Sequence, residues 1–248
     1  MIVIQGLSHR IGAFRLDNIS LEIPTGQYAV LMGKTGSGKT TLLEILCGLR
    51  PVQSGRIRLM DQDMTMTQPA RRGIGYVPQD GALFPSMTIH DHLAFALRVR
   101  KWNQSAIEER VRELAEVLGI THLLGRRPAG LSGGEAQRAA LGRALAFQPR
   151  VLLLDEPLSA LDEETRPDMY NLIKSVRRQY NVTSLHVTHN WQEAAALADQ
   201  IFVLKDGRII PYGQDELLAA AADGVSGFLG DNGAEPVSSA LDLMEKDE

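Results

Sequence analysis

Short apolar runs alternate with amphipathic segments along much of the chain. Four runs have the length and apolar content of buried strands: Tyr28–Met32, Val151–Leu154, Ser184–Val187 and Ile201–Leu204. The segments that separate the last three runs have helical spacing. Because strands that alternate with helices usually pair in parallel, the pattern predicts an α/β fold built on a mostly parallel sheet.

Three further segments depart from this alternation. Residues 1–31 and 52–80 contain short apolar segments separated by turn residues, which predicts strands joined by turns. From about Asp91 to Phe147 the pattern is helical, and Ser105–Glu108 has the spacing of a capping box. The helix predicted there has an apolar face that contains Ile107, Val111, Leu114, Val117 and Leu118.

Charge is distributed unevenly over the 248 residues. The chain carries 26 lysine and arginine residues against 30 aspartate and glutamate residues, a formal net charge of −4. Residues 219–248 hold seven of the acidic residues and one basic residue, so residues 1–218 are close to neutral. A nearly neutral body argues against a protein that binds nucleic acid electrostatically. We expect residues 1–218 to form the folded domain and residues 219–248 a short acidic tail.

The cysteine content and the apolar runs exclude several kinds of site and segment. A single cysteine, Cys47, excludes an intramolecular disulfide and a cysteine-based zinc site. No apolar run approaches the roughly 20 residues of a membrane-spanning helix, and the N-terminus lacks the pattern of a signal peptide. We expect a soluble intracellular protein that meets a membrane only through a partner.

The most specific motif is a glycine-rich loop after the first buried run. It matches the pattern G-x-x-x-x-G-K-[ST] and consists of Gly33, Lys34, Thr35, Gly36, Ser37, Gly38, Lys39 and Thr40, followed by Thr41 in a helical segment. Glycines let backbone N–H groups point at phosphate oxygens, Lys39 brings a positive charge, and the Thr40 hydroxyl can bind Mg²⁺. A plain glycine turn is the alternative, but a strand before the loop and a helix after it are the context that phosphate binding requires. The loop predicts a nucleoside triphosphate site.

Two carboxylates end the second buried run. Asp155 and Glu156 directly follow Val151–Leu154, and the carboxyl ends of strands in open α/β sheets are where ligands bind. Asp155 would hold Mg²⁺, and Glu156 would polarise the water that attacks the γ-phosphate. An apolar strand ending in Asp-Glu is common by itself, so this interpretation depends on the phosphate loop.

The sequence Leu131–Gln137 carries the third motif. Ser132 and Glu135 have the spacing of a capping box, and Gly133 and Gly134 would allow close approach of an anion to the positive end of the helix. The LSGG sequence, between the two nucleotide motifs, resembles the signature of ATP-binding cassette (ABC) proteins. This resemblance covers about residues 1–216.

The remaining motifs of that family follow in order. Gln79 matches the Q-loop glutamine, which contacts Mg²⁺ and water and senses the membrane partner. Asp162, in Ser159–Asp162, matches the D-loop that crosses the dimer interface, and His189 matches the switch histidine that contacts the γ-phosphate. We expect His186, in the apolar run before it, to be an ordinary core residue.

The chain departs from the family where an aromatic residue usually stacks on adenine. Ile11 stands in that place, and Phe14 follows three residues later. Phe14 either replaces the stacking residue or is part of a strand core, and the sequence leaves both open.

The resemblance implies a fold and a mechanism. The fold is α/β, a P-loop NTPase core with a mostly parallel sheet, an N-terminal antiparallel β subdomain and an inserted helical subdomain over about residues 91–147. Such cassettes act as head-to-tail homodimers, in which Ser132 and Gly134 of one subunit close on ATP and Mg²⁺ held by the other. ATP binding closes the pair and hydrolysis separates it.

The resemblance also implies a transport partner. The segments Leu83–Ile89 and Trp191–Ala194 look most like those of bacterial importer ATPases, among which molybdate/tungstate or sulfate uptake fits best. We therefore expect a peripheral subunit at the cytoplasmic face of the plasma membrane. It would bind integral membrane permease subunits, meet a solute-binding protein only indirectly, and bind no nucleic acid. Since few residues follow Leu218, we expect no regulatory β-domain of the kind that larger relatives carry.

Three alternatives remain at this point. An exporter ATPase of the same family would share every nucleotide motif. A soluble, non-transport cassette is a second alternative, and a cofactor-assembly ATPase is its hardest form to exclude. DNA-repair cassettes insert a long coiled coil for which the segment between Thr40 and Ser132 is too short. A binding module without hydrolysis is disfavoured by the presence of Glu156 and His189.

Overall fold

The computed structural model describes residues 1–12 and 14–212. The acidic tail that the charge pattern predicts lies outside these residues. The first half of the chain forms β1 (Ile2–Ile11), β2 (Phe14–Ile23), β3 (Tyr28–Met32), α1 (Lys39–Cys47), β4 (Ser54–Leu59), β5 (Gln62–Asp63), the 3-10 turn η1 (Pro69–Arg71), β6 (Ile74–Val77), α2 (Ile89–Val99) and α3 (Gln104–Val117). The second half forms the 3-10 turn η2 (Thr121–Leu123), α4 (Gly133–Leu145), β7 (Val151–Asp155), α5 (Arg166–Tyr180), β8 (Thr183–Val187), α6 (Trp191–Leu197), β9 (Gln200–Lys205) and β10 (Arg208–Tyr212).

The strands form two sheets of different character. One sheet has the order β2-β1-β4-β5, and all of its pairs are antiparallel. The other has the order β10-β9-β3-β8-β7-β6; its pairs are parallel except that β10 returns antiparallel along β9. The predicted α/β class, with a mostly parallel sheet and an antiparallel N-terminal sheet, is confirmed.

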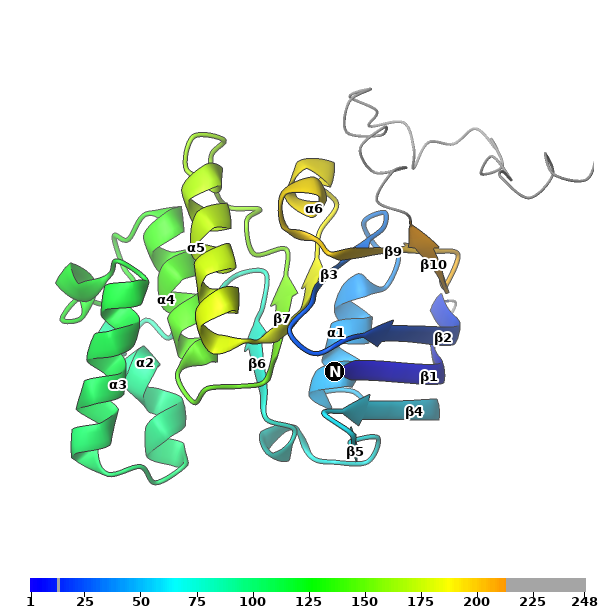
Figure 1. Cartoon of the computed structure of the whole chain (residues 1–248), viewed down its shortest axis with the longest axis horizontal. Coiled ribbons are helices and arrows are strands. Elements are labelled where there is room, and N and C mark those ends of the chain that lie inside the picture. Colours follow the sequence, from blue (N-terminus) through cyan, green and yellow to red (C-terminus); the bar gives the residue numbers. More distant parts are fainter. Residues whose placement is uncertain (13, 213–248) are drawn as a thin grey trace, which may run out of the picture.

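The parallel sheet separates two hydrophobic cores. Along β3, Ala29 and Leu31 pack with α1 and the antiparallel sheet, while Val30 and Met32 pack with the helices on the opposite face. Successive side chains of a strand point to opposite faces, so a run that is apolar throughout serves both cores. Helix α1 lies between the two sheets, and α4 and α5 cover the other face of the parallel sheet (Figure 1).

The predicted helical segment consists of α2, α3 and α4, at the end of the molecule away from the antiparallel sheet (Figure 1). Helix α2 begins two residues before the predicted Asp91, after a capping box formed by Thr88 and Asp91. The capping box predicted at Ser105–Glu108 is wrong: the N-cap of α3 is Asn103, whose side chain accepts the Ala106 N–H. An asparagine at this position satisfies the same free N–H groups, so Ser105 falls inside the first turn.

A buried arginine stabilises the C-terminal end of α1. Arg72 donates to the carbonyls of Ile45 (2.9 Å) and Leu46 (2.7 Å), where helix carbonyls have no partner within the helix. Its Nε also donates to Thr67 O at 2.8 Å, so one side chain joins α1 to the loop before β6. Burial lowers the pKa of Arg72, partly offset by the nearby Cys47 thiol.

We expect Arg72→Met to lower the free energy of unfolding by about 1.5–3 kcal/mol, because buried carbonyls lose a charged donor. Urea unfolding of the purified chain measures the change. The matched control is Arg71→Met at the exposed neighbouring position, which should change stability by less than about 0.5 kcal/mol. Equal effects of the two substitutions would show that the carbonyl contacts contribute nothing.

Candidate functional site

The carboxyl ends of four parallel strands bring the predicted nucleotide motifs to one edge of the sheet. The loop beginning at Gly33 follows β3, and Gln79 follows β6. Asp155 ends β7 with Glu156 directly after it, and His189 follows β8. Strands β6, β7, β8 and β3 are consecutive neighbours and run in the same direction. Segments that are distant in sequence therefore meet where open α/β sheets bind ligands.

The glycine-rich loop is shaped by its lysine and by its last glycine. Lys39 Nζ donates to the carbonyls of Gly33 (2.8 Å) and Lys34 (3.1 Å), so the side chain folds back across the loop. Gly38 has φ 101°, and a side chain there would come within 2.1 Å of the Phe14 ring. Only glycine fits this position, both for its backbone conformation and for space. The loop then enters α1 directly, with Gly38 as the N-cap.

The loop has the chemistry of a phosphate site. Helix α1 begins without a side-chain cap, which leaves its N-terminal N–H groups available to an anion. Ser37 Oγ is buried and has no hydrogen-bond partner among residues 1–12 and 14–212. A buried hydroxyl without a partner is costly unless a ligand supplies one. Burial lowers the pKa of Lys39, whereas the nearby Glu156 and Asp155 carboxylates raise it.

Thr40 and Asp155 present oxygen atoms next to this loop. Thr40 Oγ1 lies 3.2 Å from Asp155 Oδ1, and Asp155 is almost completely buried. Burial raises the pKa of Asp155, while the hydrogen bond from Thr40 lowers it. A hydroxyl, a carboxylate and neighbouring phosphate oxygens are the ligands that Mg²⁺ prefers. These two residues fit the predicted metal site.

A tyrosine that the sequence did not predict as part of the site also contacts Asp155. Tyr76 OH lies 3.4 Å from Asp155 Oδ2, as a second donor to the buried carboxylate. The tyrosine is in β6, next to β7 in the sheet, and this pairing between separate strands is invisible in the sequence. Burial raises the pKa of Tyr76, as does the Asp155 charge, so its hydroxyl keeps its proton.

Glu156 lies at a strained point of the backbone beside His189. Its φ is +44°, in the left-handed region that non-glycine residues rarely occupy. Its N–H donates to Val187 O at 2.8 Å, which holds the turn against the end of β8. His189 Nδ1 lies 3.2 Å from Glu156 Oε2, so the predicted base and the predicted switch histidine are in direct contact.

Gln79 is exposed, two residues beyond β6, and its side chain makes no hydrogen bond to the described part of the chain. The strand order places it after the neighbour of β7, but it makes no hydrogen bond to Thr40 or Asp155. Its predicted role depends on a ligand or on movement of the loop.

The signature residues are at the start of α4. Ser132 caps this helix and Glu135 completes the predicted capping box, with Ser132 N–H donating to Glu135 Oε2 at 2.8 Å. Gly133 packs so closely that a side chain would come within 2.8 Å of Ala160 O in the predicted D-loop. Gly134 follows in the first turn of α4, which belongs to the helical segment (Figure 1).

The Asp162 side chain forms hydrogen bonds within its own loop. Its carboxylate accepts hydrogen bonds from Thr165 N (2.9 Å) and Thr165 Oγ1 (2.6 Å), just before α5. These bonds lower the pKa of Asp162. The loop is exposed, as a segment facing a second subunit would be.

Two smaller predictions concern aromatic and histidine residues. The Phe14 ring packs against Gly38 of the phosphate loop and against the core shared by α1 and the antiparallel sheet, whereas Ile11 is exposed. His186 is a core residue, as predicted: its Nδ1 lies 2.9 Å from Tyr28 OH and its Nε2 lies 3.3 Å from Glu193.

Comparison with known proteins gives the family. The ABC transporter family model matches residues 16–159, which is more than half of the chain. The chain belongs to the ABC transporter family. It is an ATPase subunit, and the predicted membership of the ABC family is confirmed.

Several relatives match over nearly the whole chain. The molybdate/tungstate import ATP-binding protein of Archaeoglobus fulgidus is 48% identical over 89% of this chain and 90% of its own length. Its counterpart in Thermococcus kodakarensis is 43% identical over 93% of this chain and 70% of its own length. The sulfate/thiosulfate import ATP-binding protein of Bordetella parapertussis is 43% identical over 93% and 67%.

A solved structure supports the same assignment. It is the dimeric structure of a post-hydrolysis state of an ATP-binding cassette bound to ADP and Pi. It superimposes with a TM-score of 0.76 at 27% sequence identity, covering 86% of this chain and 99% of that chain. Among the described residues of the present chain, every helix is too short or too polar to cross a bilayer.

Proposed function

We propose that this chain is the ATP-hydrolysing subunit of a membrane importer for oxyanions, with molybdate or tungstate as the leading substrates. The observation that carries the proposal is the meeting of the phosphate loop, Asp155, Glu156 and His189 at one strand edge. The three relatives described above are import proteins for molybdate/tungstate or sulfate/thiosulfate, which supports import over export.

Each residue of the site has a proposed task. The loop amides from Gly33 to Thr41, with Ser37 Oγ, would bind the phosphates of ATP, and Lys39 would turn from its own loop carbonyls toward the β- and γ-phosphates. Thr40, Asp155 and Gln79 would hold Mg²⁺, which when bound neutralises charge that develops on the phosphates. Phe14 lies at the loop and would contact the adenine.

Glu156 and His189 would act on the water that attacks the γ-phosphate. The Glu156 carboxylate would accept a hydrogen bond from this water and orient it. His189, now 3.2 Å from the carboxylate, would hold Glu156 until the nucleotide binds and then contact the γ-phosphate. The strained backbone of Glu156 would fix the direction of its side chain.

Two subunits would complete the site. Ser132 and Gly133 are exposed at the start of α4, and Gly134 follows them half-buried in its first turn. They would close on the ATP held by a second copy, and Asp162 would lie at the interface between the copies. The dimeric arrangement of the similar cassette supports this homodimer.

An exposed apolar face would receive the permease. Phe84 and Phe95 are nearly half exposed, and their rings lie 6.1 Å apart. Val99 lies one turn beyond Phe95 on α2 and is also exposed. An apolar cluster of this kind on a surface indicates a protein contact. We name Phe84, Phe95 and Val99 the docking face, and we place the subunit at the cytoplasmic side of the plasma membrane.

Copurification from native membranes in mild detergent tests the proposal. We expect a multi-span permease and a solute-binding protein to accompany the chain, and the ligand of the binding protein to be an oxyanion. The variant Phe84→Ser/Phe95→Ser should lose the permease, whereas Ile210→Ser, an exposed apolar residue on β10, should retain it. A permease without a binding protein would favour an exporter, and a soluble partner alone would favour a non-transport ATPase.

A further inference from the structure

The short segment between Gln79 and Phe84 is held by an arginine of the signature helix. Arg143, in α4, donates through Nη2 to Gly81 O at 2.8 Å and through Nη1 to Ala82 O. Ala82 has φ +43°, a left-handed conformation that alanine rarely adopts. Asp80 supports this turn by accepting the Ala82 N–H at 3.1 Å. Such a conformation persists only when its surroundings hold it.

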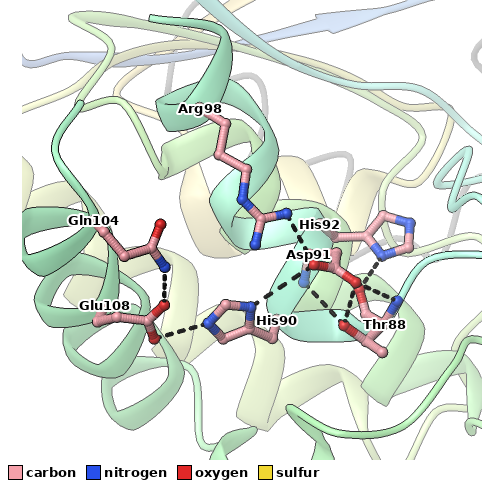
Figure 2. A network of polar contacts seen from close by, with 7 residues as sticks. All are labelled: Thr88, His90, Asp91, His92, Arg98, Gln104 and Glu108. Atoms are coloured by element: carbon pink, nitrogen blue, oxygen red, sulfur yellow. Dashed lines mark hydrogen bonds and ion pairs between the residues drawn. The ribbon is translucent and has the colours of Figure 1, made fainter. Parts of the chain in front are cut away.

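A histidine holds the other end of the segment. His92 is fully buried in α2, and its Nε2 accepts the Phe84 N–H at 2.8 Å. Its Nδ1 lies 2.7 Å from Thr88 O, and Figure 2 shows this bond. Because a backbone N–H can only donate and a carbonyl can only accept, the ring is neutral and carries its proton on Nδ1. The imidazole also stacks on the Phe84 ring, with centroids 5.9 Å apart.

The first turn of α2, which carries His92, is held by further side-chain contacts. His90 Nε2 lies 2.9 Å from Glu108 Oε2 of α3, and Asp91 contacts Thr88 and Arg98 (Figure 2). Burial lowers the pKa of His92 and the nearby Arg143 charge lowers it further, while the hydrogen bond to Thr88 and the Asp91 charge oppose them. The positive charge of Arg143 therefore favours the neutral ring that the Phe84 N–H requires.

We propose that Arg143 and His92 are positioning residues for the ATPase reaction, which together clamp residues 80–84 into one unit that directly follows Gln79 and ends at Phe84. Since Arg143 belongs to α4, the helix that Ser132 caps, the clamp joins this helix, Gln79 and the docking face. The inference rests on the proposed roles of Gln79 and of the docking face.

Amide hydrogen exchange of the whole chain tests whether the segment is one unit. In His92→Leu the Phe84 amide should exchange about tenfold faster, as expected for one lost hydrogen bond, and the Gly81 amide should follow although its own partner, Pro78 O, is untouched. His92→Gln, which keeps an acceptor near Nε2, should restore both. Arg138→Met is the matched control for the Arg143 variants, because Arg138 is also in α4 but donates to Leu118 O instead.

Faster exchange at Phe84 with an unchanged Gly81 would overturn the clamp, because the two ends would then be independent. No change at Phe84 would overturn the role of His92. Neither result depends on ATPase activity, so both stand even if the proposed function fails.

Steady-state ATPase kinetics test the effect on Gln79. Arg143→Met should lower kcat by about 10- to 100-fold, because a small displacement of a catalytic side chain, here Gln79, has an effect of this size on the rate. The KM for MgATP should stay within about twofold, since the phosphate loop is unaffected. Arg143→Lys should recover part of kcat. If the Arg143→Met variant does not fold, the kcat of Arg143→Lys provides the test instead.

A kcat unchanged in a folded Arg143 variant would overturn the inference and leave the proposed function intact. The combination of His92→Leu and Arg143→Met should lower kcat by less than the product of the separate effects, as for two residues of one unit. A strictly multiplicative result would show that they act separately.

Discussion

Glu156→Gln is expected to reduce the rate of ATP hydrolysis by about 10²- to 10⁴-fold, the usual contribution of a general base. Glutamine has the shape of glutamate and keeps an oxygen toward His189, but it cannot accept a proton from water. ATP binding should persist, because the phosphate loop and the Thr40 and Asp155 pair are unchanged. The variant should therefore accumulate as a dimer that ATP and Mg²⁺ hold closed.

Phosphate release and light scattering after gel filtration measure the two effects. Glu163→Gln is the matched control, since Glu163 is an exposed carboxylate on the loop that follows. It should hydrolyse ATP at the rate of the unmodified chain. A Glu156→Gln variant that stays monomeric with ATP and Mg²⁺ would refute the sandwich arrangement for the isolated subunit. Full hydrolysis would refute the role of Glu156.

Lys39→Met is expected to weaken ATP binding by about 2–5 kcal/mol, the usual effect of removing one partner from a desolvated charge pair. This corresponds to a roughly 30- to 5,000-fold higher Kd. The reason is specific to the loop: Lys39 has low exposure, and its ammonium group lies over the Gly33 and Lys34 carbonyls. Methionine preserves the packing of the stem and removes the charge.

Calorimetric titration with ATP and Mg²⁺ in the Glu156→Gln background measures the Kd without hydrolysis. Lys101→Met, at an exposed position before α3, should leave the Kd unchanged. Urea unfolding of each variant without nucleotide separates lost affinity from a collapsed loop. A Kd within twofold of the parent would show that the loop amides alone bind the phosphates.

Local patterns in the sequence were sufficient wherever one segment decides its own structure. The buried run Val151–Leu154 predicted β7 because a strand buried on both faces needs no polar alternation. Ser132 and Glu135 predicted their capping box because both partners lie in the same turn. The capping box at Ser105 was predicted wrongly because two nearby residues suit the N-cap. Asn103, two residues earlier, caps the same N–H groups.

Contacts between distant segments could not be predicted in this way. Tyr76 reaches Asp155 because β6 and β7 are neighbours in the sheet, and Arg143 reaches Gly81 and Ala82 because α4 packs near the end of β6. The two residues of each pair are separated in the sequence by about the length of a whole subdomain. The residues between them do not indicate which side chains will come into contact.

The sequence by itself determined the family and the mostly parallel sheet, because these depend on short motifs and on local apolar periodicity, and it named the candidate nucleotide residues. Only the tertiary structure decided which of those residues touch. It brought Thr40 to Asp155 and Glu156 to His189, and left Gln79 exposed at the end of a segment held by Arg143 and His92. The physical reason is that a side-chain contact depends on strand order and helix packing, which the chain fixes only when the whole core forms.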